Sequence, residues 1–560
     1  MQEPSILFTT VCRPFGGRGE GDSVGAELFH AQVTRAQGIF SFRQVIRSWG
    51  LDYIAENIGP PSVVLHYPSE REFVKEIRSR RYDYIGINFV VATFHKVQRM
   101  TELIRKHAPD SKIVLGGYGT VLPDDLLAPL ADYICREEGV GFFRRLLGEN
   151  TIPRLNHPYA PIPSPSLYSY RRSTKVAHIT SGLGCPNGCD FCCTSHFFKR
   201  RYIPFAATGR ELYEVITQME RKAQKEGDEL GGFILIDEDF FLQKKRAKEY
   251  LECVRREGRV FSIMGFGSIR ALSQFTADEI AEMGFETIWI AFESPSAKYE
   301  KMKGTEIGKL FGELQSRGIA ILSSMIIGFP HQNREDILGD FDRLMSIKPA
   351  LTQILIYFAF PGTPFYEKVI TENRYLPEYR DQPDYRRWDG FSMHFKHAHI
   401  TAPELEKLQR MLYRLDFERL GPSIVRLSEI WFNGYRNLKQ SPNPILKERA
   451  ERMRTFCRSA LPGLFPAILF APGREMRRNA RKLLRNIVQE TGALTFVEKI
   501  QGCVAVLLSV WTWFTLKMNL FQQPRLLRLE YDPAKTDGRA SEEYAAELKP
   551  QTLPAVSADE

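Results

Sequence analysis

The stretch with the most reactive side chains is "GCPNGCDFCC", residues 184–193, which holds four of the nine cysteines in the chain. Structural zinc normally needs two paired ligand knuckles, and this stretch supplies only one. A thioredoxin-like dithiol uses one C-x-x-C pair and leaves Cys185 unexplained. A disulfide knot would be crowded at this spacing. The remaining interpretation is that Cys185, Cys189 and Cys192 are thiolate ligands of an iron–sulfur cluster.

The fourth cysteine of the stretch differs from the other three. Three protein ligands on a four-iron cluster leave one iron free to bind another molecule. Cys193 directly follows the third predicted ligand, and a fourth ligand would close that open position. We therefore predict a 4Fe-4S cluster on Cys185, Cys189 and Cys192, with Cys193 as a bystander.

The elements that position the cysteines form a repeating β/α pattern between residues 173 and 400. Strands separated by helical segments over roughly 200 residues indicate a partial or complete β/α barrel, with its active site at the carboxyl ends of the strands. The six predicted strands are "VAHITSG", "GFILIDED", "FSIMGFGS", "TIWIAFES", "ILSSMIIGFP" and "QILIYFAFPGTP".

A three-cysteine loop after the first strand of a β/α domain resembles the radical S-adenosylmethionine (SAM) superfamily. The resemblance covers about residues 173–400 and includes "LIDEDFF", "IAFESPS", "MIIGFPHQNRED" and "FPGTPFYE". It implies an enzyme whose open iron binds SAM and cleaves it reductively to a 5′-deoxyadenosyl radical, which abstracts a substrate hydrogen. The matching positions imply a SAM site made of Phe191, Asp237, Glu238, Asp239, Arg270, Glu293 and Ser294.

The three acidic residues of that site also have a direct physical argument. An ammonium group in a partly dry site needs an anionic partner, so the row 237–239 is predicted to hold the amino group of SAM. For any single member of the row, the alternative is a solvated acidic turn.

The first 150 residues predict a separate α/β domain of the doubly wound, flavodoxin- or Rossmann-like type. Runs such as "SVVLHY" and "KIVLGGY" alternate with amphipathic helical stretches. "LGGYGT", residues 115–120, places glycines directly after a strand, where the backbone can approach a flat or phosphate-bearing group; a plain tight turn is the alternative. Residues 151–172 are rich in proline, and we interpret them as a linker.

A doubly wound domain ahead of such a barrel resembles the cobalamin-binding class of the superfamily. The comparison implies that Gly116, Gly117, Tyr118 and Thr120 approach the corrin or its nucleotide tail. No D-x-H-x-x-G motif occurs, so a histidine ligand to cobalt is not indicated. The resemblance implies cobalamin-dependent methylation of an unactivated carbon. The alternatives are a radical SAM enzyme without cobalamin that catalyses a rearrangement, oxidation or carbon–carbon bond formation, and a non-catalytic iron–sulfur or corrinoid sensor or carrier.

The region 401–535 predicts a mainly helical, basic and partly apolar domain. Residues 500–516 are uncharged, at the short limit for spanning a bilayer, and their basic surroundings favour an interfacial position. With the apolar run 461–472, they predict peripheral membrane association and a lipid or isoprenoid substrate. The alternative is buried helices that cap the barrel and build a pocket for a peptide or a natural-product intermediate. Residues 536–560 have a disordered composition.

Composition narrows the setting and the partners. The 560 residues are 43% hydrophobic and 26% charged with a net charge of +9, which is typical of a globular protein. Five scattered cysteines and the absence of a secretory signal favour the cytoplasm. No nucleic-acid partner is expected, because the basic segments alternate with apolar runs. A reducing electron donor such as flavodoxin or ferredoxin is expected from the family resemblance.

Overall fold

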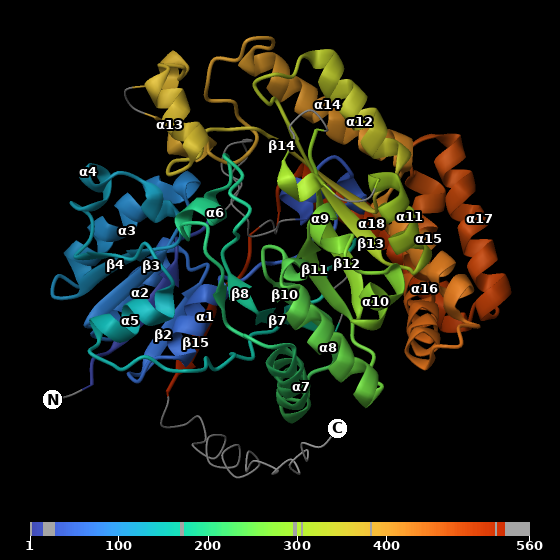
Figure 1. The fold of residues 1–560 in the computed structure, drawn as a ribbon, viewed down its shortest axis with the longest axis horizontal. Coiled ribbons are helices and arrows are strands. Elements are labelled where there is room, and N and C mark those ends of the chain that lie inside the picture. Colours follow the sequence, from blue (N-terminus) through green and yellow to red (C-terminus); the bar gives the residue numbers. More distant parts are fainter. Residues whose placement is uncertain are drawn as a thin grey trace, which may run out of the picture.

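The computed structural model describes residues 3–14, 29–168, 173–294, 299–303, 306–380, 383–520 and 523–532. Two sheets lie on either side of a central region, and helices of the carboxyl-terminal part cover the outer side of the second sheet (Figure 1). The segment 536–560, for which disorder was predicted, lies outside the described residues.

The N-terminal sheet confirms the doubly wound prediction. Its strand order is β15-β2-β1-β3-β4-β5, and β1 to β5 are parallel. Chain order reverses between β1 and β3, which is the position where ligands bind in such folds. The bounds are β1 (Ile6–Thr10), β2 (Ser62–His66), β3 (Tyr84–Asn88), β4 (Lys112–Gly116) and β5 (Tyr133–Ile134), with α1 (Trp49–Glu56), α2 (Glu70–Ser79), α3 (Phe94–His107), α4 (Asp124–Leu127) and α5 (Gly139–Leu146).

The sixth strand of this sheet comes from the other end of the chain. β15 (Leu527–Tyr531) pairs antiparallel with β2. Arg528 binds both carboxylate oxygens of Glu76, 452 positions earlier, at 2.9 Å each. The region predicted to be mainly helical therefore also contributes an edge strand. Its local sequence did not reveal this strand, because the pairing partner is so distant along the chain.

The second sheet contains all six strands predicted for the barrel. Its order is β14-β13-β12-β11-β10-β7-β6, and every neighbouring pair is parallel except β6 with β7. The sheet curls into a half-barrel, as expected from the partial-barrel prediction. The strands are β6 (Ile162–Pro163), β7 (Lys175–Thr180), β10 (Leu230–Ile236), β11 (Ile263–Gly267), β12 (Phe285–Phe292), β13 (Ala320–Ile327) and β14 (Leu351–Ile356). The short strand β6 lies within the segment interpreted as a linker.

The helices that follow the strands cover the outer face of this sheet, while Trp49 of α1 and Gln32 of the short helix η1 (Phe29–Val33) contact His178 and Gln353 of its strands. Along β12, the outward Ile288 and Ile290 are fully buried, whereas the inward Trp289 and Ala291 keep some exposure. The inner face is therefore partly accessible along β12. The helices that follow the strands are α7 (Gly209–Lys225), α8 (Lys244–Glu257), α9 (Ile269–Leu272), α10 (Ala277–Glu282), α11 (Ile307–Ser316), α12 (Arg334–Ser346) and α13 (Pro364–Thr371).

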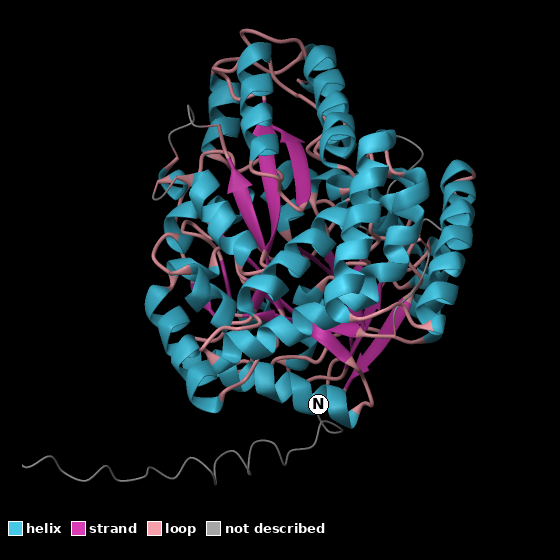
Figure 2. Ribbon diagram, turned by 90° about the vertical axis from the view of Figure 1, so that its right-hand side faces the viewer, coloured by secondary structure: helices cyan, strands magenta, loops and turns pink. Residues whose placement is uncertain are grey.

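The carboxyl-terminal helices pack on the outside of the half-barrel. Figure 2, which looks at the right-hand side of Figure 1, shows that helices cover most of this face. Arg449 is completely buried and donates to the carbonyl oxygen of Phe285 at 2.5 Å, which joins the helical layer to β12. The helices are α14 (Ala402–Leu420), α15 (Ser423–Leu438), α16 (Pro444–Phe470), α17 (Gly473–Thr491) and α18 (Phe496–Lys517).

The two apolar runs of this region have different environments. The run 461–472 lies mostly in α16, where Leu461 and Leu464 are fully buried, as in the alternative of a core helix. The run 500–516 lies in α18, the one helix in the described parts of the chain that is long and apolar enough to cross a membrane. Much of its surface is exposed.

Close packing between α15 and the turn before β13 gives a stability prediction. A Cβ atom at Gly434 would lie 2.5 Å from the Cα of Gly318, so Gly434→Ala forces two backbones apart. We expect the free energy of unfolding to fall by about 1–3 kcal/mol, measured by urea denaturation. The control is Gly312→Ala in α11, where no atom lies within 4 Å; it should be neutral or stabilise by up to about 1 kcal/mol. Equal losses in both variants would contradict the packing argument.

Candidate active site

The cysteine stretch forms a loop at the carboxyl end of the half-barrel, between β8 (Gly182–Leu183) and α6 (Cys193–Phe197). In Figure 1, α6 lies between the two sheets. Gly184 begins the loop with a φ of +84°, and a Cβ there would lie 2.2 Å from the carbonyl oxygen of Arg201. Only glycine satisfies both the left-handed backbone and this close approach.

Hydrogen bonds within the loop hold the three predicted ligands together. The N–H of Cys192 donates to the carbonyl oxygen of Cys189 at 3.0 Å. The Ser195 hydroxyl donates to the carbonyl oxygen of Cys185 at 2.7 Å and accepts from the N–H of Gly188 at 3.0 Å. The first turn of α6 therefore orients the loop that precedes it.

The three predicted ligands differ in exposure: Cys189 is buried, whereas Cys185 and Cys192 are half-buried. Burial is the main cause that raises the pKa of Cys185 to about 12 and that of Cys189 to about 11. Asp239 raises the pKa of Cys185 further, as do the thiols of Cys192 and Cys189. Iron coordination would deprotonate them.

The donor set fits a cluster better than a single ion. Within the described residues, no three His, Cys, Asp or Glu side chains surround one metal position. Each thiolate of an iron–sulfur cluster binds a different iron, so its ligands do not need to converge on one point. Three cysteines on one loop, one buried and two half-buried, suit that requirement. Cys193 begins α6, and whether it is a ligand stays a prediction.

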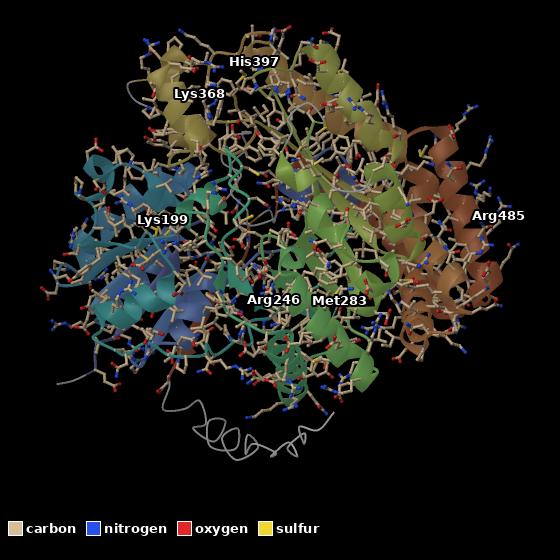
Figure 3. All side chains as sticks on the ribbon, viewed as in Figure 1. Lys199, Arg246, Met283, Lys368, His397 and Arg485 are labelled. Atoms are coloured by element: carbon tan, nitrogen blue, oxygen red, sulfur yellow. The ribbon has the colours of Figure 1, made fainter. Side chains whose placement is uncertain are left out.

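The acidic row after β10 separates into two kinds of carboxylate. Asp237 is buried, and its Oδ2 accepts from the Ser181 hydroxyl, the Tyr202 hydroxyl and Nη2 of Arg246, each at 2.7 Å. Figure 3 labels Arg246 beneath the central region. The buried ion pair and its hydrogen bonds give Asp237 a structural role that the sequence did not predict.

The next two carboxylates, those of Glu238 and Asp239, form no ion pair like that of Asp237 with Arg246. Both oxygens of Asp239 and Oε2 of Glu238 are buried without a hydrogen-bond partner of normal geometry. Burial raises the pKa of both carboxyls to about 7, and Ser268 lies close enough to Asp239 to act in the opposite direction. Buried acceptors without a donor suit a cationic ligand such as the ammonium group of SAM.

A lysine that the sequence did not single out lies among the predicted residues. Lys301, in the short helix η7 (Glu300–Met302), forms an ion pair with the buried Glu293. Its Nζ lies 5.3 Å from the ring centre of Phe191. Burial raises the pKa of Cys189 and Cys192, and the charge of Lys301 partly opposes that rise. Lys301 is one of several lysines in "KYEKMKG", so residue type and spacing carried no signal.

Aromatic rings surround the residue predicted to lie near the SAM adenine. The ring centre of Phe191 is 5.5 Å from that of Tyr299 and 5.5 Å from that of Tyr357. The Tyr299 hydroxyl donates to Oδ1 of Asp190 at 2.8 Å, which ties the cysteine loop to the segment after β12. The apolar rings form a surface on which a purine can pack.

The glycine-rich loop after β4 contains two different environments. Gly116, Gly117 and Tyr118 are half-buried and therefore accessible in part. Thr120 is fully buried, and its hydroxyl donates to the carbonyl oxygens of Gly117, at 2.8 Å, and Cys135, at 3.1 Å. Thr120 therefore holds the loop in shape and does not present a free group to a corrin.

Close packing within the protein explains why position 117 is a glycine, with no need for a ligand there. Gly117 has a φ of +87°, and a Cβ there would lie 2.0 Å from Oδ1 of Asn88. At Gly116 the nearest atom to an added Cβ is 3.9 Å away, on Cys135, so this face of the loop is open. The open, half-buried backbone is the feature that fits a flat group such as a corrin.

Tyr118 brings the two predicted sites together. Its ring centre lies 5.2 Å from that of Phe197, in the helix that follows the cysteines. Burial raises its pKa, and Glu238 and Cys193 are near enough to raise the pKa further. Of the remaining predicted residues, Ser294 is buried beside Glu293, and Arg270 is exposed on α9, where its place in a SAM site stays a prediction.

Family models match both α/β parts of the chain. Residues 38–147 match the B12 binding domain, and residues 179–344 match the radical SAM superfamily. An uncharacterized methyltransferase of Pyrococcus horikoshii is 23% identical over 383 residues, which are 61% of this chain and 80% of that protein. The bacteriochlorophyllide d C-12(1)-methyltransferase of Chlorobaculum tepidum is 22% identical over 298 residues, which are 50% of this chain and 58% of that protein.

One solved structure that matches this chain is that of the radical SAM methyltransferase TsrM from Kitasatospora setae, with cobalamin and a 4Fe-4S cluster bound. It is 15% identical, with a TM-score of 0.48, and the match covers 82% of this chain and all of that one.

Replacing aspartate by asparagine should have different effects at Asp237 and at Asp239: the first substitution should lower stability, and the second should weaken SAM binding. Asp237→Asn leaves the buried Arg246 without its counter-charge, so we expect the free energy of unfolding to fall by about 3–5 kcal/mol in urea denaturation. Asp239→Asn breaks no ion pair, so we expect stability to be retained while SAM binding weakens at least tenfold in calorimetry. Normal SAM affinity in Asp239→Asn, or a stable Asp237→Asn, would contradict these assignments.

Proposed function

Because residues 179–344 match the radical SAM superfamily and residues 38–147 match the B12 binding domain, we propose that the protein is a methyltransferase that uses cobalamin to methylate an unactivated carbon. When bound, the cluster with SAM supplies a hydrogen-abstracting radical and the corrinoid carries the methyl group. The observation that carries the proposal is the contact of Tyr118 with Phe197, which brings the glycine-rich loop next to the cysteine loop. The names of the two methyltransferase relatives support methyl transfer.

The residues of the half-barrel divide the binding of SAM among them. Cys185, Cys189 and Cys192 would hold the cluster. Both oxygens of Asp239 and Oε2 of Glu238, which are buried without a hydrogen-bond partner of normal geometry, would accept hydrogen bonds from the ammonium group. Glu293 is held beside the cysteines by its ion pair with Lys301, and Lys301 supplies positive charge next to the thiolates. Phe191 and its aromatic neighbours would pack against the adenine.

The inner face of the half-barrel favours an apolar substrate. Phe266 of β11 and Trp289 of β12 stack with ring centres 5.5 Å apart, and both keep some exposure on the inward side. These rings exclude water and bind apolar or flat groups. We therefore propose a lipid or isoprenoid substrate, with an apolar small molecule of another class as the alternative.

The proposed setting is the cytoplasm, with a reduced flavodoxin or ferredoxin as the electron donor. All nine cysteines lie in the described parts of the chain, and none forms a disulfide there, which suits a reducing compartment. Cleavage of SAM consumes an electron that no residue of the protein can supply repeatedly, so an external donor is required.

The central experiment measures 5′-deoxyadenosine after anaerobic reconstitution with iron, sulfide, SAM and a reductant. Serine at Cys185, Cys189 or Cys192 should lower cluster iron and reduce 5′-deoxyadenosine at least 100-fold, because each thiolate binds one iron. The matched control is Cys193→Ser, which should keep both. A Cys193→Ser variant without a cluster, or an active Cys189→Ser variant, would refute the ligand assignment.

The role of cobalamin is tested at the open face of the glycine-rich loop. Gly116→Ala fits within the protein but adds a methyl group on the side proposed to face the corrin. We expect unchanged thermal stability and at least tenfold weaker hydroxocobalamin binding, measured from the absorption spectrum. Gly50→Ala in α1, where no atom lies within 4 Å, is the control in the same domain. No corrin binding by the unaltered protein would favour the radical SAM enzyme without cobalamin.

A further inference from the structure

Helix α18 exposes large apolar side chains along most of its length. Leu507 is 70% exposed, and Trp511 and Trp513 are 47% and 53% exposed. Exposed apolar residues are normal when they are scattered, but a contiguous surface of this kind marks an interaction site. The large apolar residues on the exposed surface of α18 are Phe496, Val497, Ile500, Val504, Leu507, Val510, Trp511, Trp513 and Phe514. We call them the apolar face of α18.

The residues that α18 turns toward the protein are small. Gly502 packs so closely on Phe465 of α16 that an added Cβ would lie 2.8 Å from its ring. A helix on a water-exposed surface buries its large apolar residues and exposes its polar ones. Here the order is reversed, which is common for helices whose outer side meets lipid. The buried residues are Gly502, Ala505, Ser509, Thr512 and Thr515.

The apolar surface continues beyond α18. Leu469 and Phe470, at the end of α16, are also exposed. Between them and α18 lies a groove of about 530 Å³ whose lining is mostly apolar. It is lined by Gln37, Ile39, Phe40, Phe417, Phe470, Ser509, Val510 and Trp513. A hydrocarbon chain fits the chemistry of such a groove.

The neighbouring helix of the same layer is strongly basic. α17 directly precedes α18, and both pack against α16. Figure 3 shows Arg485 of α17 at the outer edge of the molecule. Lys499 and Lys517 stand near the two ends of α18. The exposed basic residues of α17 are Arg474, Arg478, Arg481, Lys482 and Arg485.

We propose that the apolar face of α18 and the end of α16 form a monotopic membrane-binding surface that inserts into the outer part of an anionic bilayer. Basic side chains near a membrane surface are attracted by anionic headgroups. Tryptophan rings and lysines prefer the boundary between hydrocarbon and water. α18 carries residues of both kinds. Membrane binding by this surface is separate from the proposed methylation reaction. It would bring the enzyme to an apolar substrate dissolved in the membrane.

The helix lies along the membrane and does not cross it. Its 22 residues extend about 33 Å, close to the thickness of a hydrocarbon core. However, its small residues from Gly502 to Thr515 remain packed on the protein, so only one side is available to lipid. Crossing the bilayer would expose those polar hydroxyls and unpack α18 from α16.

A second copy of the chain is a less suitable partner for this surface. A two-fold symmetric contact would place the same surface of both copies together. The basic helix α17 of each copy would then approach the same interface, and like charges would oppose the contact. An anionic bilayer instead neutralises those charges.

The test is flotation of the full-length protein with vesicles of phosphatidylcholine alone or with phosphatidylglycerol added. We expect binding to the anionic vesicles, and at least a tenfold loss in the double variant Leu507→Glu/Trp511→Glu. The matched control is Ile370→Glu on α13, a residue 47% exposed and outside this surface, which should bind normally. Reversing Arg478, Arg481 and Arg485 to glutamate should weaken binding to anionic vesicles only.

Three results would overturn the proposal: no flotation of the unaltered protein, unchanged flotation of the double variant, or a dimer in light scattering that the double variant dissociates. Thermal denaturation of each variant shows whether it folds. 5′-deoxyadenosine formation should be unchanged in the double variant, so failure of membrane binding is distinguishable from failure of the proposed chemistry.

Discussion

The buried carboxylate of Asp237 is the interaction on which the candidate site depends. It accepts hydrogen bonds from Ser181, which precedes the cysteine loop, from Tyr202, which follows it, and from Arg246 on α8. One charged group therefore fixes both ends of the loop to the end of β10. Because a buried ion pair is stable only when every partner is in place, the loop and the strand ends adopt one arrangement. The neighbouring Asp239 has no ion pair, and neither of its buried carboxylate oxygens has a hydrogen-bond partner of normal geometry.

A second constraint holds the two α/β parts against each other. Tyr118, in the loop after β4 of the N-terminal sheet, packs on α6, the helix that orients the cysteines. On the far edge of that sheet, β15 returns from the end of the chain and pairs with β2, with Arg528 bound to Glu76. In the order of the chain, the half-barrel lies between β5 and β15 of that sheet. A methyl carrier and a radical source have to act on one substrate, and this arrangement places their proposed loops in contact.

The fold was largely predictable because its strands are short, buried and apolar, and because helices separate them. Every strand predicted for the half-barrel lies in one sheet, and the N-terminal strand order is that of a doubly wound domain. The edge strand β15 could not be predicted, because an edge strand is defined by its partner and not by its own pattern. The same holds for α18: composition indicated an interfacial helix, but only packing shows that its small side is the buried one.

By itself, the sequence determined the chemistry class of this protein. Three features depend on local residue types and are therefore visible in the sequence. They are the spacing of Cys185, Cys189 and Cys192, the acidic row after the second strand, and the order of the β/α units. Tertiary structure decided which of the marked residues are free to act. Asp237 and Thr120 are occupied by protein partners, Asp239 is not, and Lys301 enters the site from a segment without a motif. Such assignments depend on hydrogen bonds between segments far apart in the chain, and only the folded structure places those partners together.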